Sequence, residues 1–230
     1  MSFSTATSAL ASIGFAMPAN VAKTLSVGRA AADSGASRER AQEALRVAIE
    51  AGDVEAAQEA ADRLAVASSP ERRSVASDIL NSTEASAARM FPAGKAWEFA
   101  AKHFDKLAGE FTANMELIDP DAEAPVLAAD KVRQAYAAFP QQARDLDTAA
   151  TALGAAAELA SGVYIGHEKA HQIGLVCEGP DHLLGDLIQI WRANRGSGRG
   201  RRWADMVRLG VTLRAATAAT FQPYGIEGEE

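Results

Sequence analysis

The clearest hydrophobic pattern in the chain follows the dipeptide Phe91-Pro92. Apolar side chains there recur every three or four positions, at Trp97, Ala101, Phe104, Ala108, Phe111, Met115 and Ile118. This spacing places them on one side of a helix and predicts a single buried stripe on a helix of about 24 residues. Asp119-Pro120 then ends the helix.

Start and stop signals predict further helices on both sides of this stripe. Pro18 and Pro70 are suited to a first helical position, Ser37, Asp53 and Ser69 to N-caps, and Gly52 to a C-terminal stop. We find no alternating pattern rich in β-branched residues, so no strand is expected. The sequence predicts an all-α protein of about nine to ten helices, in two helical lobes with a groove between them. The other predicted helices span residues 18–33, 37–51, 54–67, 70–90, 125–138, 141–161, 163–176, 180–194 and 201–221.

Segment 119–125 is the predicted boundary between the lobes, because it carries three acids and two prolines in seven residues. The expected organisation is an uncharged arm (1–17), an N-terminal helical lobe (18–118), a linker (119–125), a C-terminal helical lobe (126–222) with a basic loop (192–203), and an acidic tail (223–230).

The N-terminal arm has no charged side chain before Lys23. It lacks the basic start of a secretory signal, so we expect no signal peptide and a location in the cytoplasm or an assembled particle. Its large apolar side chains must be buried on its own domain or on a neighbouring subunit. We predict a homo-oligomer formed through the arm. These side chains are Phe3, Leu10, Ile13, Phe15 and Met17.

Composition restricts the remaining possibilities. The chain of 230 residues contains 52 alanines, which favour helices, and Cys177 is its only cysteine, so it forms no internal disulfide. No apolar run reaches the length of about 18 residues that spans a bilayer, so no membrane partner is predicted. The net charge of −7 disfavours general binding to DNA or anionic membranes.

Against this acidic background, five arginines and no lysine lie in the glycine-rich segment 192–203. Guanidinium groups match phosphate oxygens, and Trp191 and Trp203 could stack a base or hold a guanidinium by a cation–π contact. The alternative is a solvated loop between helices. The candidate nucleic-acid-binding residues are Arg192, Arg195, Arg199, Arg201, Arg202, Trp203 and Arg208.

A second motif reads His-Glu-x-x-His-x-x-Gly-x-x-Cys from His167 to Cys177. It resembles the zinc-binding helix of metallopeptidases, and that resemblance implies His167 and His171 as metal ligands, Cys177 in the place of the third ligand, and Glu168 as general base. Lys169 and Cys177 depart from the pattern, and no strand is predicted to hold a peptide substrate. We therefore expect a solvent-facing helix stripe, with no bound metal or cofactor and no enzymatic activity.

Three functional hypotheses remain open. The first is an assembling coat or nucleocapsid-like protein that binds single-stranded nucleic acid through the arginine segment. The second is an all-helical interaction or scaffold protein that works through exposed helix faces. The third is a zinc-dependent hydrolase built on His167, Glu168 and His171.

Overall fold

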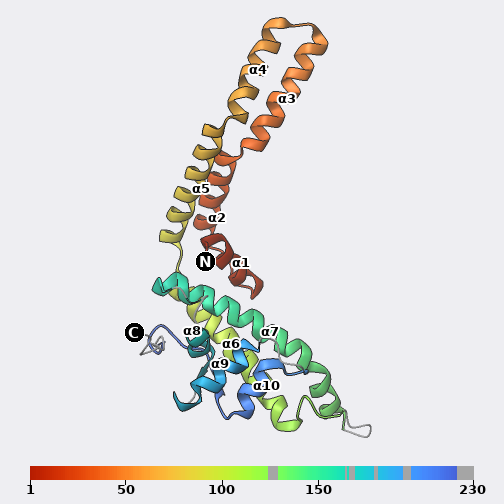
Figure 1. Ribbon diagram of the computed structural model, residues 1–230, viewed down its shortest axis with the longest axis vertical. Coiled ribbons are helices and arrows are strands. Elements are labelled where there is room, and N and C mark those ends of the chain that lie inside the picture. The colour runs from red at the N-terminus through yellow and green to blue at the C-terminus, as the bar shows by residue number, and fades with distance from the viewer. Residues whose placement is uncertain (124–128, 164, 166–168, 179–180, 194–197, 222–230) are drawn as a thin grey trace. The chain divides into compact units, whose positions relative to one another are not determined.

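The computed structural model describes residues 1–123, 129–163, 165, 169–178, 181–193 and 198–221, without the side chains of 34–36, 73, 169–170 and 181. It contains ten α-helices in these ranges, which confirms the predicted all-α fold (Figure 1). The chain forms two compact units. Unit 1 consists of Met1–Ala16 and the chain from Pro92 onwards, and unit 2 is Met17–Phe91.

Unit 1 is built on a hairpin of two long helices, α6 (Ala93–Leu117) and α7 (Asp130–Ser161). The predicted stripe on α6 is confirmed, with Trp97, Phe104 and Phe111 all buried. Phe111 meets Phe139 of α7 edge to face, with ring centroids 5.5 Å apart. The facing side of α7 is mostly alanine, and small side chains let the two helices approach closely.

Helix α7 differs from the prediction of two helices at 125–138 and 141–161. It is one helix that continues through Pro140. Proline removes a helical hydrogen bond and usually ends a helix. Here Phe139, Ala143 and Leu146 are fully buried on either side of Pro140, and this burial in unit 1 outweighs the lost bond.

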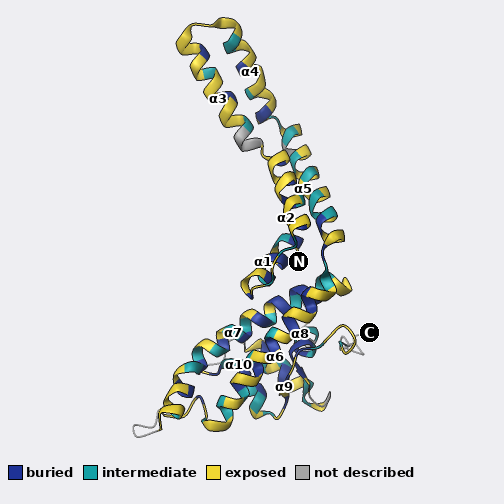
Figure 2. Ribbon diagram, turned by 180° about the vertical axis from the view of Figure 1, so that it is seen from behind, coloured by how far each residue is buried: buried dark blue, intermediate teal, exposed yellow. Residues whose placement is uncertain are grey.

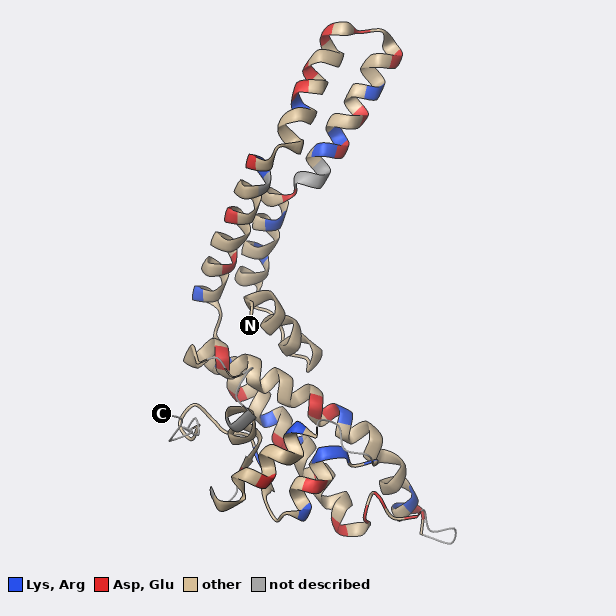
Figure 3. Ribbon diagram, viewed as in Figure 1, with Lys and Arg blue, Asp and Glu red and all other residues tan. Residues whose placement is uncertain are grey.

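The N-terminal arm forms a helix, α1 (Phe3–Ser12), that packs on α7 of the same chain. Ser2 caps it by accepting a hydrogen bond from the Thr5 amide at 3.2 Å. Figure 3 shows α1 without a single charged residue. Phe3, Leu10 and Ile13 are at most 8% exposed, so the arm docks on its own domain, one of the two alternatives for its apolar side chains.

Short elements complete unit 1 beside α7. They are α8 (Lys169–Val176), β1 (Cys177–Glu178), a 3₁₀ turn η1 (Asp181–Leu183), α9 (Leu184–Arg192), α10 (Arg201–Arg208) and β2 (Thr212–Leu213). The two strands pair antiparallel, with Cys177 opposite Leu213. No strand was expected, and these two-residue strands carry no alternating pattern that a sequence could reveal.

The last helix is much shorter than predicted, since α10 ends at Arg208 rather than near 221. Gly210 has a φ of 85° and turns the chain out of the helix. The following backbone then finds partners elsewhere in unit 1. The Arg214 amide donates to the Val176 carbonyl at 2.9 Å, and the Ala215 amide donates to the Asp105 carboxylate at 2.7 Å.

Unit 2 contains two helix pairs, α2 (Ala19–Ala32) with α5 (Pro70–Met90) and α3 (Ser34–Ala51) with α4 (Val54–Ser68). The predicted caps Asp53 and Ser69 are confirmed, since Asp53 accepts from the Ala56 amide at 3.0 Å and Ser69 from the Arg72 amide at 3.2 Å. The prediction of Ser37 as an N-cap is wrong, because α3 begins at Ser34 and the Ser37 hydroxyl donates to the Asp33 carbonyl at 3.3 Å. The buried side chains of α3 and α4 are all alanine, at 41, 48, 60 and 67. Figure 2 shows the rest of both helices largely exposed.

The boundaries of the two units lie elsewhere than those of the predicted lobes. The described part of the predicted linker, residues 119–123, lies inside unit 1, because α6 and α7 on either side pack together, and residues 124 and 125 lie outside the described residues. None of the described helices combines the length and the apolar content needed to cross a membrane.

Candidate functional sites: the arginine segment and the α3–α4 hairpin

Asp147 of α7 is the centre of a polar cluster that holds the arginine segment. Its carboxylate accepts from Arg201 at 3.1 Å, and from Arg202 at 2.5 and 3.0 Å. The indole N–H of Trp203 donates to the same carboxylate at 3.0 Å. The side chains of Arg202 and Asp147 are only 15% and 24% exposed. One carboxylate therefore docks the start of α10 onto α7.

Both tryptophans that border the segment are buried, Trp191 at 5% and Trp203 at 0% exposure. They meet edge to face, and the Arg202 guanidinium lies 4.2 Å from the centre of the Trp191 ring. Stacking a base and holding a guanidinium by a cation–π contact were the two roles expected of these tryptophans, and Trp191 holds a guanidinium. Neither ring presents a free face for a base.

Arg199 is held by the turn after α6. Its backbone amide donates to the Asp121 carboxylate at 3.1 Å, and its guanidinium donates to the Pro120 carbonyl at 3.3 Å. The same guanidinium contacts the hydroxyl of Tyr136 and lies 4.1 Å from the centre of its ring. Gly198 makes the approach possible, since a Cβ there would lie 2.2 Å from Asp121.

Arg208 lies among three carboxylates, those of Asp119 (2.5 Å), Asp121 (2.7 Å) and Asp205 (2.9 Å). Burial opposes its charge, yet the hydrogen bonds to Asp121 and Asp119 outweigh burial and raise the pKa of Arg208. The pKa of Asp119 is lowered, by the hydrogen bond from the Asp121 amide and then by Arg208. This arginine is already paired within the chain.

Two predicted residues remain. Arg195 lies outside the described residues, as do Asn194, Gly196 and Ser197. Arg192 is exposed at the end of α9 and has no hydrogen bond or ion pair within the part of the chain that the structure describes. The structure thus brings Arg201, Arg202 and Trp203 together on Asp147, and it places Arg199 and Arg208 on the 119–122 turn.

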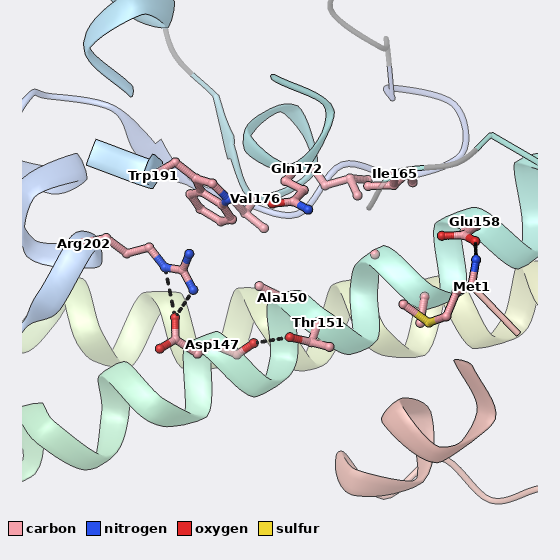
Figure 4. A pocket seen from close by; sticks show the side chains of 13 residues that line it. Met1, Asp147, Ala150, Thr151, Glu158, Ile165, Gln172, Val176, Trp191 and Arg202 are labelled. Carbon is pink, nitrogen blue, oxygen red and sulfur yellow. Dashed lines mark hydrogen bonds and ion pairs between the residues drawn. The ribbon is translucent and has the colours of Figure 1, made fainter. Parts of the chain in front are cut away.

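A small pocket of about 160 Å³ opens beside this cluster (Figure 4). Its floor is the small-residue face of α7, with Ala150, Gly154 and Ala155. Trp191 lies above it, and its indole N–H donates to Gln172 at 2.6 Å. The ion pair of Asp147 and Arg202 lines one end of the pocket, and the ion pair of Glu158 with the Met1 amine lines the other end. These polar groups are already paired with each other.

The metallopeptidase-like string is described only in part, because His167 and Glu168 lie outside the described residues. His171 is half-buried on α8, while Cys177 is buried on β1 and donates its S–H to the Ile173 carbonyl at 3.4 Å. Burial raises the pKa of the Cys177 thiol to about 12. No three His, Cys, Asp or Glu residues among those described are arranged to hold a metal ion. A neutral buried thiol is a poor metal ligand.

The α3–α4 hairpin of unit 2 carries a surface that sequence reasoning did not single out. Ile49 and Val54 are 63% and 79% exposed. Leu45 on α3, and Ala57, Ala61 and Leu64 on α4, share their side at helical spacing and are half-buried or exposed. We call these six residues the apolar hairpin face. The signal was the spacing of the apolar residues 54, 57, 61 and 64, which form a second stripe on α4 beside the buried alanines at 60 and 67.

The opposite side of the hairpin is charged. On α4, Glu55, Glu59, Asp62 and Arg63 all fall on this side at helical spacing, so the apolar hairpin face of α4 has no charge. A groove of about 590 Å³ on the charged side is lined by Arg40, Ala44, Glu59, Asp62, Arg63 and Val66, among others. Val47 and Val66 are also exposed on the charged side, and on α3 the side of Leu45 and Ile49 continues with Gln42 and Arg38. The apolar hairpin face is therefore an uncharged patch of six residues on the side opposite the charged groove.

No protein-family model, curated protein or solved structure matches this chain.

Proposed function

We propose that the protein is an all-helical interaction protein that docks on its partner through the apolar hairpin face of unit 2. The observation that supports this is the distribution of exposed apolar side chains. Eight of the twelve large ones among the described residues lie in unit 2, the shorter unit. They are Val27, Val47, Ile49, Val54, Val66, Val75, Leu80 and Met90. Two of them, Val54 and Ile49, lie on the apolar hairpin face, and these two are the most exposed of the twelve.

The physical reason is that unit 2 buries little of its own apolar surface. A helix pair has one seam, and the seam of α3 and α4 consists of alanines, which contribute little burial per residue. Contiguous exposed apolar surface is rare on free proteins and is typical of interaction sites. Unit 1 differs in this respect, because Phe104 and Phe111 of α6 and Phe139 of α7 are fully buried.

A cysteine pair tests this function. Ala61 on the apolar hairpin face and Ala44 on the charged side are both exposed alanines of one hairpin. The native thiol of Cys177 is buried and protonated, so it reacts slowly with maleimide. In dilute purified protein, Ala61→Cys and Ala44→Cys should react equally fast. In an extract of the protein's own cells, Ala61→Cys should react about tenfold more slowly, because a bound partner covers it.

Two outcomes would contradict the proposal. Slow labelling of Ala61→Cys in purified protein that has the mass of a single chain would mean that the chain itself covers the face. Equal labelling of both cysteines in the extract would mean that nothing docks there.

Nucleic-acid binding by the arginine segment is the second candidate. Arg192 favours it, since this guanidinium is exposed and unpaired among the described residues. Four of the other candidates, Arg199, Arg201, Arg202 and Arg208, are occupied by partners within the chain. Phosphates would have to compete with these partners, so this candidate has less support.

A further inference from the structure

We infer that the partner of the apolar hairpin face is a second copy of the chain, and that two α3–α4 hairpins pack into a four-helix bundle. This inference rests on the proposed function and names its partner. The interface differs from the one predicted from the sequence, an oligomer through residues 1–17, because α1 is already buried on α7 of its own chain.

Charge is the first argument for a second copy. The α4 side of the apolar hairpin face has no ionisable side chain, and on α3 the side of Leu45 and Ile49 reaches its first charge only at Arg38, far from the turn. A charge on the partner placed against Ile49 or against α4 would therefore be buried without an opposite charge. The partner must therefore present an uncharged apolar strip. The same strip on a second copy meets this requirement, whereas the charged side of the hairpin does not.

The order of side-chain sizes along the face is the second argument. Ile49 and Val54 lie near the turn, Ala57 and Ala61 lie farther along α4 beside Leu45 of α3, and Leu64 lies beyond them. A two-fold axis at the middle places the small alanines of both copies against each other, where helices need to approach most closely. Ile49 and Val54 of one copy then face the Leu64 end of the other. Large side chains thus fill the space on both sides of the close approach.

The length of the hairpin fits this arrangement as well. Helices α3 and α4 have 18 and 15 residues, about four turns each, and antiparallel four-helix bundles are built from hairpins with short connections such as Gly52-Asp53. The charged residues Glu55, Glu59, Asp62 and Arg63 stay on the outside of such a bundle, in contact with water.

Lysine substitutions on α3 test the interface with a matched control. Ile49 and Val47 lie two positions apart on opposite sides of α3, and are 63% and 50% exposed. Lysine is a good helix former, so neither change should unfold the hairpin. The wild type should have twice the chain mass of 24.1 kDa by light scattering. Ile49→Lys should raise the dissociation constant at least about 100-fold, because each copy brings one lysine into the interface, and Val47→Lys should leave it unchanged.

A disulfide test locates the axis. Under mild oxidation Ala61→Cys should link two copies, and Ala44→Cys on the charged side should not. A wild type that keeps the single-chain mass at all concentrations would overturn the second-copy inference, as would equal dissociation by Ile49→Lys and Val47→Lys. If the wild type is a monomer and its Ala61→Cys variant reacts rapidly with maleimide in purified form but slowly in the extract, the face binds a different partner and only the second-copy inference is wrong. If the purified monomeric variant reacts slowly, the chain itself covers the face and the proposed function is wrong as well.

Discussion

At the scale of single residues, the most consequential contact is the carboxylate of Asp147. It lies more than fifty residues before its partners in the sequence, yet it binds Arg201, Arg202 and Trp203 together. Arg202 also stacks on Trp191, so its charge is compensated on two sides. These arginines therefore stabilise unit 1, whatever else the exposed Arg192 binds.

This contact predicts the effect of replacing the carboxylate. Asp147→Asn leaves two guanidinium groups facing an amide in a partly buried site, and should lower the free energy of unfolding by about 2–3 kcal/mol. Chemical denaturation followed by helical circular dichroism measures the loss. Asp145→Asn, two residues away and bonded only to Gln141, should change it by less than about 0.5 kcal/mol. Equal effects of the two variants would show that Asp147 does not hold α10.

At the scale of elements, the packing of α2 on α5 in unit 2 depends on a glycine. A Cβ on Gly28 of α2 would lie 2.2 Å from the Thr83 hydroxyl of α5, a distance that real side chains do not reach. Glycine inside a helix is otherwise unfavourable. Its position in α2 is therefore explained by the close approach of α5.

We expect two glycine-to-alanine changes to have opposite effects on the melting temperature. Gly28→Ala gains about 1 kcal/mol of helix propensity but overpacks the α2–α5 seam, at a cost of about 1–3 kcal/mol, so the melting temperature should fall. Gly109→Ala in α6 meets no neighbour within 4 Å, and should gain about 0.5–1 kcal/mol. A melting temperature raised by both changes would contradict the packing of α2 on α5.

At the scale of the whole molecule, charge decides how nucleic-acid binding can be tested. The chain has a net charge of −7, and most arginines of the segment already have carboxylate or carbonyl partners. Substituting Arg201 or Arg202 would disturb the Asp147 cluster, so a lost affinity would not report on phosphate contacts. Arg192 provides a test that leaves the fold intact.

The second candidate function predicts single-strand binding at low salt that weakens in Arg192→Glu, with the log–log salt slope reduced by about one. Fluorescence anisotropy of a labelled oligonucleotide measures both. Arg29→Glu is the matched control, because Arg29 is an exposed arginine in the last turn of α2 in unit 2, as Arg192 is in α9. Undetectable binding by the wild type at low salt would exclude this function, as would an equal loss in both variants.

Much of the fold follows from the sequence alone. The 3.6-residue period of Trp97, Phe104 and Phe111, and the caps Asp53 and Ser69, are local signals that identify helices without knowledge of their neighbours. The uncharged arm likewise had to be buried, because its apolar side chains gain free energy from leaving water.

Only the tertiary structure decided the rest, because the deciding contacts join residues far apart in the chain. Helix α7 continues through Pro140 because it packs on α6. The last helix ends early because the backbone after Gly210 donates hydrogen bonds to carbonyls of α8 and to the Asp105 carboxylate. The arginine cluster was visible in the sequence, but its partners Asp147, Asp119 and Asp121 were not, since an ion pair depends on distance in space. For the same reason, the apolar hairpin face became recognisable only when the seam of α3 and α4 showed which side remained uncovered.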